Sequence, residues 1–173
     1  MKEVPEFEKY PVSEEEMGKR YKKLTEAVAR QVVLLYKVGK EVGGEKFTER
    51  LKEEYYKVGQ NLAGMVKDRS GATEDDFKDC LGGTPKVCDY IDDANANFWD
   101  GYVENTAKAF EKELKTCPLA RPWSEAPELC EVFLGEFVKG LANKLNPKFK
   151  TSGFSKLLVK GDSVCRYRIE MGD

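Results

Sequence analysis

The stretch FSKLLVKGDSVCRYRI, residues 154–169, decides the fold class of this chain. Two runs rich in apolar residues, 154–159 and 164–169, flank the short turn Lys160-Gly161-Asp162-Ser163. Two such runs around a turn that contains Gly and Asp are typical of an antiparallel hairpin. The stretch therefore predicts a C-terminal β-hairpin, the clearest strand pattern in the sequence.

A long amphipathic helix is expected before this hairpin, from residue 125 to about 145. Ser124 is a candidate N-cap, Pro127 is tolerated in the first turn, and Asn146-Pro147 ends the helix. Apolar residues recur every three or four positions, which places them on one face: Leu129, Val132, Phe133, Phe137, Leu141 and Leu145.

Two further amphipathic helices are predicted in the N-terminal half. Ser13 and Glu16 form a capping box that starts the first helix, and Gly43-Gly44 ends it. The second helix continues to Arg69-Ser70-Gly71. Both have an apolar stripe, made of Tyr21, Leu24, Val28, Val32, Leu35 and Val38 in the first and Phe47, Leu51, Tyr55, Val58, Leu62 and Met65 in the second. The pair predicts a helical hairpin.

The middle of the chain is less regular. Thr73 starts a short helix that ends at Gly82-Gly83, and residues 84–100 fit either a short helix or a loop. From Tyr102 to Thr116 a helical period and a strand period compete. We therefore expect an α+β fold, with an N-terminal helical hairpin followed by a small antiparallel sheet packed on a long helix. Residues 13–173 form one domain, after a flexible arm at residues 1–12.

Composition excludes several function classes. The chain has 29 basic and 31 acidic side chains and a formal charge of −2, so it offers no general attraction for nucleic acid or an anionic membrane. The N-terminus lacks an apolar run, which predicts a cytoplasmic protein. Five cysteines in a reducing compartment are expected to be free thiols. Because the chain has no histidine, any acid, base or nucleophile must be a thiol, carboxylate, amine or phenol.

The C-terminal order of a strand, Cys117-Pro118, a helix with Cys130, and the Gly161-Asp162-x-x-Cys165 hairpin resembles the L-2-amino-thiazoline-4-carboxylic acid hydrolase-like family. The likeness covers roughly residues 100–170. It implies that 102–116 is extended, with a break near Ala107-Lys108, and that the protein hydrolyses a C=N or amide-like bond of a small cyclic or amino-acid-derived substrate.

The same hairpin is similar to the four-vinyl-reductase-type small-molecule-binding domain, in which some relatives bind zinc through cysteines. Leu157 and Leu158 stand where such zinc-binding relatives have a thiol. The spacing of Cys117, Cys130 and Cys165 also lacks a Cys-x-x-Cys pair. We therefore predict no metal site and no cofactor.

The candidate catalytic residues are Cys117, Cys165 and Asp162. A thiolate at either cysteine could attack an electrophilic carbon if Arg121, Arg166 or a helix N-terminus lowered its pKa. Asp162 could orient Cys165, although an Asp in a hairpin turn more often serves the turn itself. The alternative for all three cysteines is packing in the core, which applies most strongly to Cys130.

The candidate substrate-binding residues are aromatic and polar side chains near the predicted strands: Trp99, Tyr102, Glu104, Asn105 and Arg121. The leading functional hypothesis is a small-molecule hydrolase acting on carbon–nitrogen bonds other than peptide bonds. The alternative is a non-catalytic small-molecule-binding module that acts as a sensor or carrier. A third hypothesis is a scaffold that oligomerises through the N-terminal helices, and a homodimer is compatible with all three.

Overall fold

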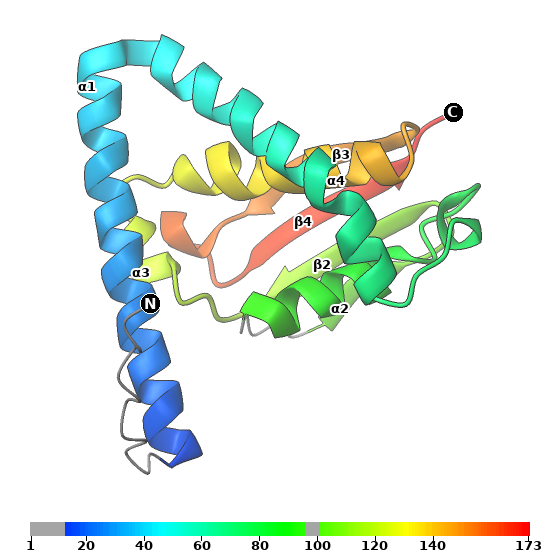
Figure 1. The fold of residues 1–173 in the computed structure, drawn as a ribbon, viewed down its shortest axis with the longest axis horizontal. Coiled ribbons are helices and arrows are strands. Elements are labelled where there is room, and N and C mark those ends of the chain that lie inside the picture. The colour runs from blue at the N-terminus through cyan, green and yellow to red at the C-terminus, as the bar shows by residue number, and fades with distance from the viewer. Residues whose placement is uncertain (1–12, 96–100) are drawn as a thin grey trace, which may run out of the picture.

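The computed structural model describes residues 13–95 and 101–173. Helices form the first half and a mixed helix and sheet region forms the second (Figure 1). The elements are α1 (Glu14–Arg69), η1 (Asp75–Phe77), α2 (Thr84–Asn95), β1 (Gly101–Asn105), β2 (Ala109–Leu114), α3 (Ala120–Trp123), η2 (Cys130–Gly135), α4 (Glu136–Leu145), β3 (Phe149–Lys156), η3 (Leu158–Lys160) and β4 (Cys165–Met171).

The two predicted N-terminal helices are present as two arms of α1. Ser13 caps the first arm, since its hydroxyl oxygen accepts a hydrogen bond from the Glu16 amide at 3.2 Å, while the Glu16 carboxylate pairs with Arg20. Gly44 breaks the helix with a φ of 58°, a left-handed conformation that glycine adopts readily. The arms diverge from this kink as an open hairpin (Figure 1).

The sheet has four antiparallel strands in the order β1-β2-β4-β3. The pairing of β2 with β4 joins the β1-β2 hairpin to the C-terminal hairpin, β3-β4. The first strand of the C-terminal hairpin was predicted at 154–159, but β3 ends at Lys156 and residues 158–160 form η3, because Leu157 and Val159 are buried in a second hydrophobic cluster. Strand β4 alternates as its sequence predicts, because Cys165, Tyr167 and Ile169 are buried and Arg166 and Arg168 are not. One face of the sheet is therefore apolar and the other is charged.

The apolar face packs against helices to form a first hydrophobic cluster. Phe110, Tyr167 and Ile169 from the sheet meet Leu141 of α4 and Val66 of the second α1 arm. The architecture is an α+β fold with the sheet packed on helices, which confirms the predicted fold class. The second cluster fills the space beneath the first α1 arm.

The helices α1 and α4 cross at two glycines. A β-carbon at Gly140 would lie 1.9 Å from the carbonyl oxygen of Tyr56, and one at Gly59 would lie 2.1 Å from the carbonyl oxygen of Phe137. Each glycine therefore lets the backbone of the opposite helix approach directly. This contact sets the position of α4 between α1 and the sheet.

The predicted helix from 125 to 145 differs from the structure at its start. Ser124 does not cap it. Instead, Ser124 ends α3, and its hydroxyl donates to the carbonyl of Arg121 at 2.8 Å. The following helix begins with η2, a single stretch of π-helix, and continues as α4 to Leu145. Burial of Trp123 in the second cluster provides a tertiary reason for this local change.

The sequence left the structure of 84–100 and of 102–116 open. Residues Thr84–Asn95 are helical, and the segment 102–116 is extended, with β1 and β2 joined through a turn at 106–108 that includes the predicted break. Thr73 to Cys80 contains a short 3₁₀ turn, η1, rather than a full helix. The predicted arm at residues 1–12 lies outside the described residues.

Candidate functional site

Three of the five cysteines come together beneath the first arm of α1. Cys117 follows β2, Cys130 begins η2 and Cys165 begins β4, opposite Leu114 in the sheet. Cys130 and Cys165 belong to the second hydrophobic cluster, a buried set comprising Ala29, Val33, Tyr36, Trp123, Ala126, Leu129, Cys130, Leu157, Val159 and Cys165. All five cysteines are free thiols.

Burial governs the protonation of these thiols. Burial, together with negative charge at Cys117 and Cys165, raises the pKa of Cys130 to about 12. Burial also raises the pKa of Cys117 and of Cys165, while backbone N–H groups of Leu119 and Leu158 oppose the shift in each case. A nucleophilic thiol needs the opposite shift. The three thiols are therefore protonated at neutral pH.

The predicted sources of positive potential lie elsewhere. Arg166 points away from this cluster and forms an ion pair with Glu113 at 2.7 Å on the charged face of the sheet. Arg121 is exposed on α3. The cation that lowers the pKa of Cys130 is Lys160, and its effect is smaller than that of burial.

Asp162 organises the loop that leads to Cys165. Its carboxylate accepts a hydrogen bond from the Leu157 amide at 2.7 Å, and the Leu158 amide donates to the Cys165 sulfur at 3.2 Å. Gly161 adopts a φ of 93° at the end of η3, which closes the loop. Asp162 thus holds the loop that precedes Cys165, which fits the turn role and leaves its catalytic role a prediction.

We predict that Cys130 is protected from alkylation in the folded protein. A pKa near 12 instead of 9 reduces its thiolate fraction by roughly 1000-fold. Mass spectrometry after timed iodoacetamide treatment at pH 8 is expected to show Cys80 modified before Cys130, because Cys80 belongs to neither hydrophobic cluster. In urea all five cysteines are expected to react at similar rates. Equal rates for Cys130 and Cys80 in the folded state would contradict the prediction.

A half-buried carboxylate next to Cys130 was missed by sequence reasoning. Burial raises the pKa of Glu131, and a hydrogen bond with the Phe154 backbone opposes the shift. The Glu131 carboxylate lies close to the backbone of Gly135 and Gly153, since β-carbons there would fall 2.9 and 3.5 Å from its oxygen. Glu131 lies in the π-helix η2, and π-helical segments are frequent at functional sites.

A second polar group lies between α2 and the sheet. Lys112 of β2 forms a buried ion pair with Asp92 of α2, and Tyr102 donates a hydrogen bond to the carboxylate of Asp89. Burial lowers the pKa of Lys112 and, with the Asp89 contact, raises the pKa of Tyr102. Tyr102 was predicted from sequence as a substrate-binding residue. The ion pair was not predicted, because Asp92 and Lys112 are twenty residues apart in the sequence.

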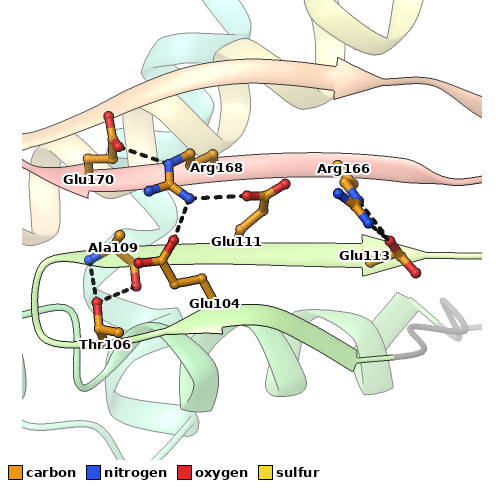
Figure 2. A network of polar contacts seen from close by, with 8 residues as sticks. All are labelled: Glu104, Thr106, Ala109, Glu111, Glu113, Arg166, Arg168 and Glu170. Atoms are coloured by element: carbon orange, nitrogen blue, oxygen red, sulfur yellow. Dashed lines mark hydrogen bonds and ion pairs between the residues drawn. The ribbon is translucent and has the colours of Figure 1, made fainter.

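The remaining predicted binding residues do not gather around the thiols. Glu104 lies on the charged face of the sheet, where Arg168 donates to Glu104 at 2.7 Å, Glu111 at 3.1 Å and Glu170 at 2.8 Å (Figure 2). Asn105 is exposed at the end of β1, next to the turn that Thr106 closes through its hydrogen bonds with Ala109 (Figure 2). Trp99 lies outside the described residues.

An apolar cavity of about 40 Å³ lies between α2, α4 and the sheet. Apart from the thiol of Cys88 and the side chain of Thr84, the lining is hydrocarbon: Val87, Ile91, Val138, Leu141, Ala142, Leu145, Phe149 and Ile169. Burial raises the pKa of Cys88 to about 11. The cavity adjoins the buried polar group, because Cys88 precedes Asp89 and Ile91 precedes Asp92 in α2.

The described residues contain neither a metal site nor a membrane span. Within residues 13–95 and 101–173, no three Cys, Asp or Glu side chains are arranged to hold a metal ion. None of the helices in the same ranges has an apolar stretch long enough to cross a bilayer.

Comparison with known proteins gives a likeness in fold. No family model and no curated protein matches the chain. Among solved structures, subunit 3 of the trafficking protein particle complex from Naegleria fowleri, covalently bound to palmitic acid, superimposes with a TM-score of 0.57. The match has 12% identity and covers 88% of this chain and 97% of that chain. At this identity the likeness shows a shared fold.

Proposed function

We propose that this chain is a non-catalytic module that binds an apolar small molecule, with its site at the cavity between α2, α4 and the sheet. The observation that carries the proposal is the lining of that cavity, which is nearly all hydrocarbon. Ligand sites are typically concave and apolar, and empty apolar cavities in protein cores take up small hydrophobic molecules. Five free thiols fit a reducing compartment such as the cytoplasm.

The size of the cavity restricts the ligand. About 40 Å³ is little more than the roughly 30 Å³ that one water occupies in the liquid, so the cavity as it stands has room only for the end of a hydrocarbon chain. A larger occupant requires α2 to move away from α4. The similarly folded trafficking subunit is covalently bound to palmitic acid, which supports a hydrocarbon chain as the ligand class here.

The test compares two variants that change the cavity in opposite directions. Ala142→Val fills the space and is expected to weaken binding of a fatty acid such as palmitate by about tenfold. Val138→Ala enlarges the space and is expected to maintain or strengthen binding. Isothermal titration calorimetry measures both affinities, and native mass spectrometry of the purified protein shows whether a ligand is already bound. No binding by the wild type, or equal affinities for both variants, would contradict the proposal.

A second candidate function is hydrolysis of a C=N or amide-like bond, favoured by the raised pKa of Glu131 beside the thiol cluster. A carboxyl group with a raised pKa can accept a proton from water near neutral pH, which a chain without histidine requires. In this hypothesis Glu131 is the general base, and the protonated thiols of Cys130 and Cys165 line the site.

Incubation with L-2-amino-thiazoline-4-carboxylate and related cyclic amidines tests this second function. Hydrolysis is expected to fall at least about 100-fold in Glu131→Gln, which keeps the shape of the side chain but removes the base. Glu125→Gln, at an exposed position that does not contribute to the pKa shift of Glu131, is the control and is expected to retain activity. Absence of any product from the wild type across the panel would reject hydrolysis of these substrates.

A further inference from the structure

The first arm of α1 has an apolar row on its outer surface. The row, here called the seam, repeats with alternating steps of three and four residues and contains Met17, Tyr21, Leu24, Val28, Gln31, Leu35, Val38 and Val42. Its apolar members are exposed, including Leu24 at 63%, Leu35 at 68% and Val42 at 85%. An apolar row of this spacing over more than three heptads is typical of a coiled coil.

The seam is separate from the side of α1 that packs on the rest of the molecule. Ala29, Val33 and Tyr36 are buried in the second cluster. Lys37 and Lys40 flank that buried side and pair with Glu125 and Glu128 at 2.9 and 3.1 Å. At 100° per residue the seam lies roughly 130° around the helix axis from the buried residues. Figure 1 shows this arm along the outer edge of the molecule, where a second helix can approach.

We propose that the seam binds the seam of a second copy of this chain in antiparallel orientation. Two identical helices related by a two-fold axis form a self-complementary interface. If the two-fold axis passes between residues 29 and 30 of both helices, every seam position of one copy lies opposite a seam position of the second copy. Leu24 then packs on Leu35 of the second copy, and the other layers are Tyr21 with Val38, Met17 with Val42, and Val28 with Gln31.

Charge complementarity selects the antiparallel orientation. The positions that flank the seam on one side are Arg20, Ala27, Leu34 and Glu41. In the antiparallel register Arg20 lies beside Glu41 of the second copy, twice by symmetry, and Ala27 lies beside Leu34. In a parallel pair the two charged residues would be about 31 Å apart along the axis. Gln31 is the one polar member of the seam, and a polar residue there helps to define the register at some cost in stability.

Sedimentation equilibrium of the full chain tests the dimer. The wild type is expected to have twice the monomer mass of 19.6 kDa at about 10 to 100 μM. Leu24→Glu/Leu35→Glu places acidic groups opposite one another and is expected to weaken dimerisation at least about 100-fold. Val58→Glu, an exposed apolar position on the second arm of the same helix, is the matched control and should leave the dimer intact. Circular dichroism checks that each variant is folded.

A charge exchange tests the orientation. Arg20→Glu and Glu41→Arg are each expected to weaken the dimer by about two- to tenfold, and the double variant is expected to restore it. A wild-type chain that stays monomeric throughout the concentration range would overturn the proposal, as would a dimer unaffected by the double leucine substitution. Failure of the charge exchange to restore the dimer would overturn the antiparallel register. None of these outcomes depends on whether a small molecule is bound.

Discussion

Replacing Gly140 by alanine is expected to destabilise the protein by about 2 to 4 kcal/mol. The new β-carbon would lie 1.9 Å from the carbonyl oxygen of Tyr56 and 2.8 Å from its carbonyl carbon. Both atoms belong to the backbone of α1, so the clash cannot be relieved by a side-chain rotation. The helices α1 and α4 would have to separate, which opens the first cluster around Leu141 and Val66. Urea denaturation followed by circular dichroism measures the loss.

Gly64→Ala is the matched control. Gly64 lies in the second arm of α1, as Tyr56 does, and no atom outside its own helix lies within 4 Å of the point that a β-carbon would occupy there. Alanine at this position is expected to stabilise the helix by up to about 1 kcal/mol, since glycine has the lower helix propensity. If Gly140→Ala were as stable as Gly64→Ala, the close approach of α1 and α4 would be wrong.

Replacing Lys112 by methionine is expected to cost about 3 to 5 kcal/mol of stability. The substitution keeps most of the side-chain volume but leaves the Asp92 carboxylate, which is 5% exposed, without its cation. A buried charge without a partner destabilises the folded state more than the intact buried ion pair does.

Two further variants separate charge from packing. Lys112→Met/Asp92→Leu removes both charges and is expected to recover much of the lost stability, since an apolar pair can replace a buried ion pair. Lys156→Met, at an exposed position of β3, is expected to change stability by less than about 0.5 kcal/mol. A double variant as unstable as Lys112→Met would show that the cost arises from shape rather than from charge.

The parts of the fold that sequence reasoning predicted are those that depend on neighbouring residues. The apolar-rich run at 164–169 indicated a strand, and β4 spans Cys165–Met171. Ser13 and Gly43-Gly44 indicated where helices begin and break, and the structure places the cap and the kink there. The strand assignment of 102–116 rested on family resemblance, because two periods competed in the sequence.

The contacts between distant segments could not be predicted in this way. The helix start at Ser124 was wrong because Trp123 is drawn into the second cluster by residues of α1 and η2. Glu131 appeared to be an ordinary helical glutamate, and its raised pKa comes from burial against Gly135 and Gly153. The direction of the cysteine pKa shifts also depends on this packing, since the same thiols near a free cation would shift the opposite way.

Hydrophobic period, caps and glycine conformations act over a few residues, so the residues alone were enough to predict the α+β class, the two N-terminal helices with their break at Gly43-Gly44, and a strand near 164–169. Only packing between distant segments shows that Cys130 and Cys165 are buried in one cluster, that Lys112 is paired with Asp92 inside the protein, and that the seam faces outward. These features depend on which surfaces the folded chain removes from water. The desolvation of a side chain depends on how the whole molecule packs around it, so it cannot be predicted from a local pattern of residues.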